Sequence, residues 1–225
     1  MPIHELTLII PAKNEAESLP IVLNELKKYD YKINIVLHIT DIDTIQVIKK
    51  YDVNIIYQKN LGYGDALIRG IEQCKTKYFC IFNADGSFNP SEINQMLKTL
   101  QSKKLDFIFA SRYDANSGSD DDTVLTLVGN YIFTYIGKIF FKLNITDILY
   151  TFVIGKTEQA KKLNLDQKDF SFCVELPIKA KKMKMQLGNI NSYERKRIAG
   201  KKKVNAFKDG FLILKHMIRL FFMKL

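Results

Sequence analysis

The sequence has few cysteines and no low-complexity tract, and both shortages narrow the class of protein. Its three cysteines, Cys74, Cys80 and Cys173, lack metal-ligand spacing. They are typical of reduced core thiols in a cytosolic protein, which disfavours a disulfide framework. Of the 225 residues, 47% are hydrophobic and 26% are charged. This balance disfavours disorder and predicts one domain with a sizeable core.

Two kinds of apolar segment are also missing. The first ten residues, MPIHELTLII, have no basic region ahead of their apolar stretch, so they predict a first strand and not a secretion signal. No stretch approaches the roughly 18 apolar residues of a membrane span, so we expect no transmembrane helix.

Positive charge is concentrated in the last third of the chain. The net charge is +10, and residues 155–225 carry 18 Lys/Arg against 6 Asp/Glu, whereas residues 1–154 carry 16 against 18. We expect the last third to face phosphate, lipid headgroups or nucleic acid. Nucleic acid is disfavoured because no groove-fitting or aromatic-interleaved motif is present.

Strand and helix patterns alternate with short connections through residue 113. We expect strands over 6–12, 32–39, 53–58, 78–83 and 105–113, and helices over 14–29, 43–51, 64–75 and 91–103. This alternation predicts an α/β fold with an open, mainly parallel sheet and helices on both faces. Ligands of such sheets bind beyond the carboxyl ends of the strands.

Polar segments follow all five predicted strands, and they read PAKNE, TDID, KNLGYGD, NADGS and SRY. Asp85 in NADGS is therefore expected to face the ligand crevice, where a carboxylate can hold a cation. Its small neighbours would let an anionic ligand approach the backbone. The alternative is that NADGS is only a turn, because Asn, Asp, Gly and Ser favour turns.

Four segments resemble glycosyltransferase family 2, which has the Rossmann-like GT-A fold, and within it the polyprenyl-phosphate sugar synthases of the dolichol-phosphate mannose synthase type. They span residues 8–26, 60–90, 106–147 with an interruption at 114–128, and 175–203. The resemblance implies one transferase domain over 1–210, with a nucleotide-sugar half (1–113) and an acceptor half (114–210).

The resemblance also implies a divalent cation, Mg²⁺ or Mn²⁺, that neutralises a diphosphate leaving group. The metal ligands would be Asp85, Asn83 and Ser87. The nucleotide would be held by the first loop, by the end of the second strand, by the third loop and by the metal motif. These residues are Pro11, Ala12, Asn14, Glu15, Asp41, Gly64, Asn83 and Asp85.

Two departures from the family pattern concern this half. The family motif Asp-x-Asp reads Asn83-Ala84-Asp85 here, which removes one carboxylate. The family acids after the second strand are replaced by Leu37 and His38, although Asp41 lies close by. These departures favour an alternative, a degenerate, non-catalytic module that binds a nucleotide sugar or a partner.

On the acceptor side, the resemblance assigns Arg112, Arg197 and Lys203 to an acceptor phosphate, since guanidinium groups suit phosphate geometry. Asp85 and Arg112 are the expected catalytic residues. A surface salt bridge for Arg112 and a solvated face for the basic run are the alternatives. For Asp147 and Glu175 the sequence leaves two roles open: a catalytic base, or an ion-pair partner of the basic run. The acidic segment 114–122 is expected to be a mobile loop.

The last segment, residues 211–225, has apolar residues on one helical face with Lys and Arg among them. It predicts either an amphipathic helix in the plane of a membrane or a helix packed on the core. The expected function is thus metal-dependent, inverting transfer of a sugar from a nucleotide-diphosphate donor to a polyprenyl-phosphate-type acceptor. We expect it on the cytoplasmic face of an anionic membrane; the sequence does not indicate the oligomeric state.

Overall fold

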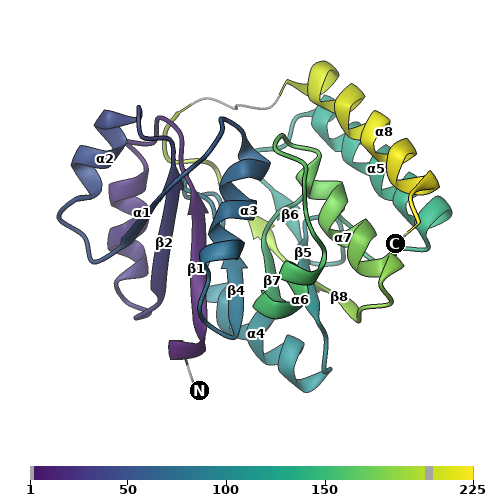
Figure 1. Cartoon of the computed structure of the whole chain (residues 1–225), viewed down its shortest axis with the longest axis horizontal. Helices are drawn as coiled ribbons and strands as arrows, with labels where there is room; N and C mark the ends of the chain where they lie inside the picture. The colour runs from purple at the N-terminus through teal and green to yellow at the C-terminus, as the bar shows by residue number, and fades with distance from the viewer. Residues whose placement is uncertain (1–2, 201–204, 225) are drawn as a thin grey trace.

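A seven-stranded sheet forms the centre of the protein, seen here in a computed structural model that describes residues 3–200 and 205–224 (Figure 1). The strand order is β3-β2-β1-β4-β7-β5-β8. All neighbours are parallel except β7, which is antiparallel to both β4 and β5. The strands are β1 (Leu6–Pro11), β2 (Lys32–Leu37), β3 (Asn54–Tyr57), β4 (Tyr78–Ile81), β5 (Phe107–Ser111), β7 (Val153–Lys156) and β8 (Leu187–Asn191).

Helices cover both faces of this sheet, which confirms the predicted fold class. Alternate residues of β1 separate the two cores: Leu8 and Ile10 pack with α1 (Leu19–Leu26), α2 (Ile42–Ile48) and α4 (Ile93–Ser102). Ile9 packs into the other core with α3 (Tyr63–Gln73), α6 (Thr157–Lys162), α7 (Phe172–Lys182) and α8 (Ala206–Phe222). Because both faces are buried, the strands read as continuous apolar runs.

The helix expected over 14–29 is shorter in the structure. It begins at Leu19, with Pro20 in its first turn, where proline is tolerated because its missing N–H has no partner there. The freed segment before it forms a loop in which Asn14 has a left-handed φ of 53°. This loop, at the carboxyl end of β1, is part of the site described below.

The acidic segment 114–122, which is expected to be a mobile loop, contains a short strand, and its mobility stays a prediction. Its Gly118–Ser119 pair forms a short strand, β6, alongside β9 (Tyr193–Glu194). Ser119 Oγ donates to Glu194 Oε2 at 2.5 Å, and Tyr193 Oη donates to Asp120 Oδ1 at 2.6 Å. The segment is thereby attached to the basic segment that follows β8.

Helix α5 (Val124–Phe141) corrects one expectation. By length and composition alone it is the one helix of the described residues that could cross a membrane, and 17% of it is buried. Its apolar residues do not form a continuous run, because Thr126, Asn130, Thr134 and Lys138 interrupt them. Helix α8 lies beside α5 and begins at Ala206, capped by Asn205, five residues before the expected start at 211 (Figure 1).

Candidate active site

A pocket of about 500 Å³ lies beyond the carboxyl ends of β1, β2 and β4. Ten of the twelve predicted site residues line it. They are Pro11, Ala12, Asn14, Glu15, Asp41, Asn83, Asp85, Ser87, Arg112 and Arg197. The predicted crevice is therefore a real cavity, and the residues predicted from distant segments meet around it.

Two predicted residues stand apart. Gly64 does not line the pocket: a Cβ there would lie 2.0 Å from the carbonyl oxygen of Gln167, so this glycine permits the first turn of α3 to pack closely against the backbone of residues 167–169. Its nucleotide contact stays a prediction without support from the geometry. Lys203 lies outside the described residues, so its contact with an acceptor phosphate also stays a prediction.

The side of the pocket that is predicted to hold the nucleotide is built by two loops that bind each other. Asp41 accepts hydrogen bonds from Asn14 N at 2.7 Å and from Thr44 N at 3.4 Å, so it caps α2 and fixes the first loop at once. Glu15 N donates to Thr44 Oγ1 at 3.0 Å. The first loop is therefore held to the start of α2 through the backbone N–H groups of Asn14 and Glu15.

The metal motif forms a turn in which each side chain has a defined partner. Asp85 Oδ1 accepts from Ser87 N at 3.1 Å, Asn83 Oδ1 accepts from Phe88 N at 3.3 Å, and Asn83 Nδ2 donates to Ser87 Oγ. Gly86 has a φ of 82°, in the region that favours glycine. The turn interpretation of NADGS is thus correct for its backbone, while Asp85 still lines the pocket.

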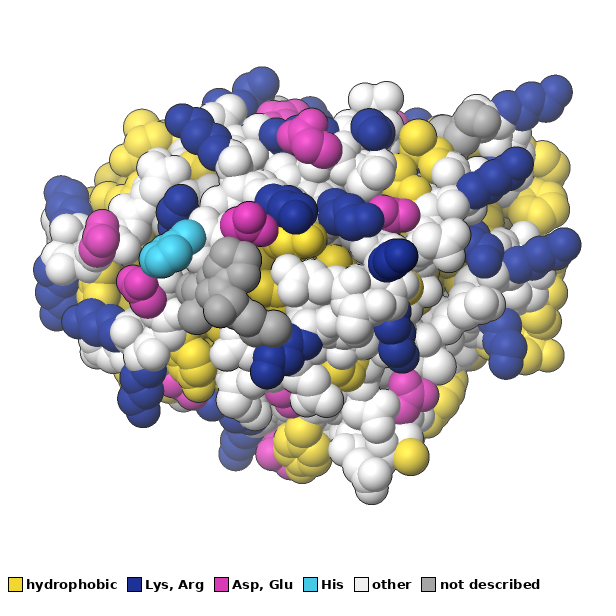
Figure 2. Space-filling model, turned by 90° about the horizontal axis from the view of Figure 1, so that it is seen from below, with side chains coloured by type: hydrophobic (Ala, Val, Ile, Leu, Met, Phe, Trp, Pro, Cys, Tyr) yellow, Lys and Arg dark blue, Asp and Glu magenta, His cyan; other side chains and the backbone are white. Residues whose placement is uncertain are grey.

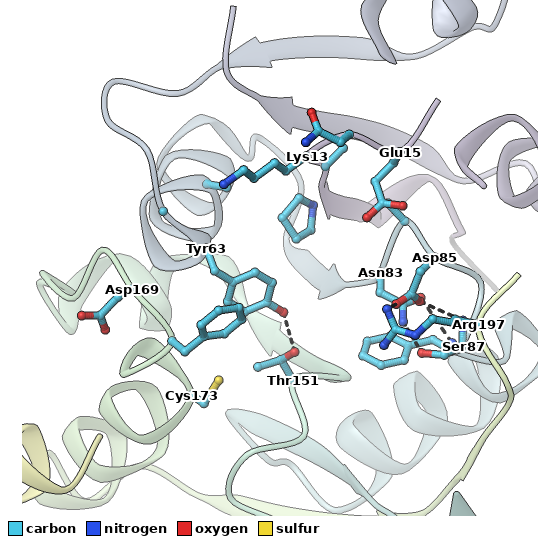
Figure 3. Close-up of a pocket in the computed structure, with 18 of the residues that line it drawn as sticks. Lys13, Glu15, Tyr63, Asn83, Asp85, Ser87, Thr151, Asp169, Cys173 and Arg197 are labelled. Atoms are coloured by element: carbon cyan, nitrogen blue, oxygen red, sulfur yellow. Dashed lines mark hydrogen bonds and ion pairs between the residues drawn. The ribbon is translucent and has the colours of Figure 1, made fainter. Parts of the chain in front are cut away.

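Asp85 also contacts the basic segment. Arg197 Nη1 lies 3.4 Å from Asp85 Oδ2, and Arg197 Nη2 lies 2.8 Å from Asp121 Oδ2 (Figure 3). The Asp121 hydrogen bond raises the pKa of Arg197 above its ordinary value, burial opposes that rise, and Asp85 adds to it. Two backbone hydrogen bonds also join these segments: Ile198 N donates to Asp85 O at 2.8 Å, and Arg195 N donates to Ser87 O at 2.8 Å.

The motif fits a divalent cation whose ligands come partly from substrate. No group of three His, Cys, Asp or Glu side chains that could hold a metal exists within residues 3–200 and 205–224. Asp85 is the one carboxylate of the motif, and Mg²⁺ commonly binds one or two carboxylates plus substrate phosphates. Asp85 would therefore hold Mg²⁺ or Mn²⁺ once a diphosphate supplies further oxygens, with Asn83 and Ser87 beside it.

Arg112 is buried among carboxylates. Its Nε and Nη2 donate to Asp147 at 2.7 and 3.1 Å, and its Nη1 donates to Glu194 at 3.0 Å. Burial is the largest single influence and disfavours the charged form, but the attraction of Asp147, its hydrogen bond and the attraction of Glu194 together keep the pKa of Arg112 well above its usual value. The guanidinium thus has carboxylate partners where an acceptor phosphate was expected. Its phosphate contact stays a prediction.

Asp147 and Glu175, left open as bases, both pair with cations. Asp147 binds Arg112, and Glu175 lies 2.7 Å from Lys179 in a fully buried pair. Glu175 also accepts from the backbone N–H of Asp166 and Gln167. It therefore fixes the segment before α7 and does not face the pocket.

The side of the pocket opposite Asp85 was missed by the sequence reasoning. Tyr63 stacks on Phe170 with ring centroids 5.0 Å apart, and Tyr63 and Thr151 share a hydrogen bond of 2.6 Å (Figure 3). Burial raises the pKa of Tyr63. Lys13, also missed, lines the pocket beside Asn14 and Glu15. Lys13 and Tyr63 both lie in polar segments that follow predicted strands, but nothing in the sequence indicates that Phe170 contacts Tyr63.

Comparisons with known proteins agree with this geometry. Residues 7–163 match the model of glycosyl transferase family 2. An uncharacterized protein of Methanocaldococcus jannaschii is 27% identical over 193 residues, covering 83% of this chain and 79% of that protein. An uncharacterized glycosyltransferase of Mycobacterium bovis is 28% identical over 94 residues, 42% of this chain and 43% of its own length.

Solved structures share the fold at low identity. Glucosyl-3-phosphoglycerate synthase from Mycobacterium tuberculosis, in complex with Mn²⁺, UDP and phosphoglyceric acid, superposes with a TM-score of 0.75 at 11% identity. The match covers 97% of this chain and 78% of that one. A second structure of that synthase, with Mg²⁺ and UDP, has a TM-score of 0.67 at 11% identity and covers 96% and 78%. The dolichol-phosphate mannose synthase type is not specifically indicated by these matches.

Proposed function

The chain belongs to glycosyl transferase family 2, and from this premise we propose that it transfers a sugar from a nucleotide-diphosphate donor to an acceptor phosphate with inversion at the anomeric carbon. The observation that carries the proposal is the meeting of Asp85, the first loop and Arg197 around one pocket. That arrangement offers a carboxylate for a cation and a guanidinium for a phosphate.

The donor would lie across the strand ends. The loop of Pro11, Ala12, Asn14 and Glu15, fixed by Asp41, would hold the nucleotide. Asp85 would hold Mg²⁺ or Mn²⁺, which neutralises charge on the departing diphosphate when bound. The use of Mn²⁺ or Mg²⁺ with UDP by the structurally similar synthase supports this choice of metal.

The reaction needs no strong base. An acceptor phosphate is ionised at neutral pH, so its oxygen can attack the anomeric carbon without a base. The bond from that carbon to the diphosphate breaks, and its electron pair leaves with the diphosphate oxygen. Asp147 and Glu175 are buried and paired with cations, which is compatible with a reaction that uses no carboxylate as a base. Arg197 is the candidate anchor for the acceptor phosphate, and it would exchange Asp85 and Asp121 for phosphate oxygens.

We take the acceptor to be a polyprenyl phosphate, with the enzyme bound peripherally to the cytoplasmic face of a membrane. The resemblance of the acceptor half to polyprenyl-phosphate synthases supports this assignment, as does the positive charge of residues 155–225. The structurally similar synthase contains phosphoglyceric acid instead. A water-soluble phosphorylated acid is therefore the necessary comparison in any assay.

The test has two arms. A panel of nucleotide-diphosphate sugars with and without Mn²⁺ is screened by thermal shift, where a hundredfold excess over Kd adds about 2.7 kcal/mol of stability. The donor found is then incubated with polyprenyl phosphate or with phosphoglycerate. Transfer to polyprenyl phosphate, abolished in Asp85→Asn, is expected. No stabilisation and no turnover with any donor would overturn the proposal.

One observation favours the non-catalytic alternative. Asn83 replaces a carboxylate, and Arg197 already neutralises the remaining one, so a metal must compete for Asp85. A module of this kind would bind a nucleotide sugar without turnover. Donor binding with no transfer, in the wild type and in Asn83→Asp alike, would support it.

A further inference from the structure

Helices α5 and α8 lie side by side and run in the same direction on the outside of the protein (Figure 1). Gly210, in the second turn of α8, faces Phe133 in the middle of α5. Near their ends, Phe221 contacts Phe140 and Phe141 with ring centroids 5.9 and 6.1 Å apart. The two helices therefore present one joint outer surface.

The outer side of α5 is apolar along its length. Only Asn130, Gly137 and Phe141 of this helix are buried. Most of its exposed apolar side chains recur at helical spacing, and eight are at least half exposed: Val124, Leu125, Val128, Tyr131, Ile132, Tyr135, Ile139 and Phe140. Soluble monomers rarely expose contiguous apolar surface of this extent, and such surfaces mark interaction sites.

Helix α8 continues this surface. Its buried side chains face the core, whereas six apolar residues at helical spacing are exposed. These are Phe207, Phe211, Leu214, Ile218, Phe221 and Phe222. We name the eight exposed apolar residues of α5 and these six of α8 the apolar platform.

Basic side chains border the apolar platform on both outer edges. On α5, Lys138 is two positions from Phe140, so it projects from the side of the helix that faces away from α8. On α8, Arg219 is likewise two positions from Phe221, and Lys215 lies one turn before it. Figure 2 shows hydrophobic side chains with Lys and Arg beside them at its right-hand end, toward these helices.

Acidic residues are almost absent from the two helices. Helix α5 has none, and the one acid of α8, Asp209, lines the pocket. An apolar stripe between cationic edges is complementary to an anionic bilayer, with acyl chains below the stripe and headgroups at its rims. A protein partner would need both an apolar face and a flanking acid on each side.

Both helices begin beside the pocket. Asp209 in the first turn of α8 lines it, and Asp122, just before α5, lies 3.4 Å from Nη1 of the pocket residue Arg112. The apolar platform therefore runs outward from the rim of the site. A surface that binds the platform is held next to the pocket mouth.

We propose that the apolar platform docks in the plane of an anionic lipid bilayer and places the pocket mouth at the headgroups. The docking stands on exposure and charge alone. Only its use, delivery of a lipid-linked phosphate to the pocket, rests on the proposed function.

The experiment compares the full chain with two matched double variants. Ile132→Asp with Ile139→Asp changes apolar-platform residues that are 53% and 50% exposed. Ile21→Asp with Ile42→Asp changes helical residues that are 51% and 54% exposed at the other end of the sheet, on α1 and α2 (Figure 1). Binding is measured by co-sedimentation with phosphatidylcholine vesicles, with or without phosphatidylglycerol, and folding by thermal melting.

We expect the wild type and the α1/α2 variant to bind vesicles that contain phosphatidylglycerol, less tightly as salt rises. The apolar-platform variant is expected to melt normally and to bind at least tenfold more weakly. Equal binding by both variants would overturn the proposal. So would a wild-type dimer without vesicle binding that the apolar-platform variant dissociates, because a second copy would then cover the surface.

Resistance of the bound protein to extraction at alkaline pH would also overturn in-plane docking, because α5 would then cross the bilayer. Thermal shift with the nucleotide sugar separates this proposal from the proposed function. Stabilisation by the donor is expected to be the same in the apolar-platform variant as in the wild type. Vesicle binding without any donor binding would leave the docking intact and refute the transferase proposal.

Discussion

Arg197 and Asp85 form an ion pair in the pocket, with Nη1 and Oδ2 3.4 Å apart, although they come from segments more than a hundred residues apart. Both side chains are mostly buried, at 22% and 17% exposure. The predicted acceptor anchor thus contacts the predicted metal ligand. A cation that binds Asp85 must displace this guanidinium or share the carboxylate with it.

Arg197→Ala is expected to strengthen Mn²⁺ binding in the absence of nucleotide, because it removes the competing cation from Asp85. We expect a gain of roughly tenfold, which corresponds to about 1.4 kcal/mol. Titration calorimetry with Mn²⁺ measures it. Arg195→Ala is the control, since Arg195 lies on the same segment but pairs with Glu25. A wild-type affinity in Arg197→Ala would show that the pair does not restrict metal binding.

Asn83→Asp is expected to tighten Mn²⁺ binding in the presence of the nucleotide diphosphate, because it adds a carboxylate beside Asp85. The same change removes the hydrogen bond that Asn83 Nδ2 donates to Ser87 Oγ, so we expect a modest loss of thermal stability. Asn89→Asp, four residues beyond Asp85 at the cap of the following turn, is the matched control. Equal metal affinity in all three proteins would exclude position 83 from the metal site.

Gly64→Ala is expected to destabilise the fold by about 1–3 kcal/mol, because the new methyl group would lie 2.0 Å from the Gln167 carbonyl oxygen and such overpacking costs energy. Chemical denaturation measures the loss. Gly129→Ala is the control: it lies within α5, and a Cβ there meets nothing within 4 Å. That change is expected to stabilise by roughly 0.5–1 kcal/mol through helix propensity. Equal effects would contradict the packing role of Gly64.

The free energy of unfolding is expected to fall as the pH drops from 6.5 toward about 4, in part because of His216. Burial lowers the pKa of His216 from 6.5 to about 4, and Arg219 adds to the shift. Asp166 and Asp169 oppose it, while Lys179 reinforces it. The unfolded chain therefore binds a proton in this window that the folded chain does not, so acidification favours unfolding.

His216→Leu is expected to flatten this slope, because it removes the group whose Nε2 is buried without a hydrogen-bond partner among the described residues. Denaturation curves at several pH values measure the slope. His38→Leu is the control, since that imidazole is partly exposed and binds Thr40. An unchanged slope in His216→Leu would mean that other groups cause the acid sensitivity.

The alternation of strands and helices made the architecture predictable from sequence. Each of the five strands expected in the first 113 residues is present, because a strand that is buried on both faces of a parallel sheet stands out as a short apolar run. The end of each strand then located the pocket. What the pattern does not contain is the spatial order of the strands. Nothing in the sequence of Val153–Lys156 indicates that β7 lies antiparallel between β4 and β5.

The site was predictable where motif and strand end coincide, as at Asp85. It was not predictable where a long-range partner decides the role. Arg112 stands at a strand end as expected, but Asp147 and Glu194 reach it from far along the chain. Gly64 was expected to contact the nucleotide, but in the structure the backbone around Gln167 occupies the space beside it. Residue type gives the available chemistry, and tertiary neighbours decide its use.

The position of β7 has a consequence for how the protein is made. Strand β5 has no hydrogen-bonded neighbour on the β4 side until residues 153–156 exist, and its other neighbour, β8, comes later still. During synthesis, the apolar Phe107–Ser111 segment therefore cannot pair with a neighbouring strand until at least forty further residues have been added. Exposed strands of this kind are prone to aggregation. A ribosome-bound chain that ends before residue 153 is expected to keep this segment accessible to chaperones.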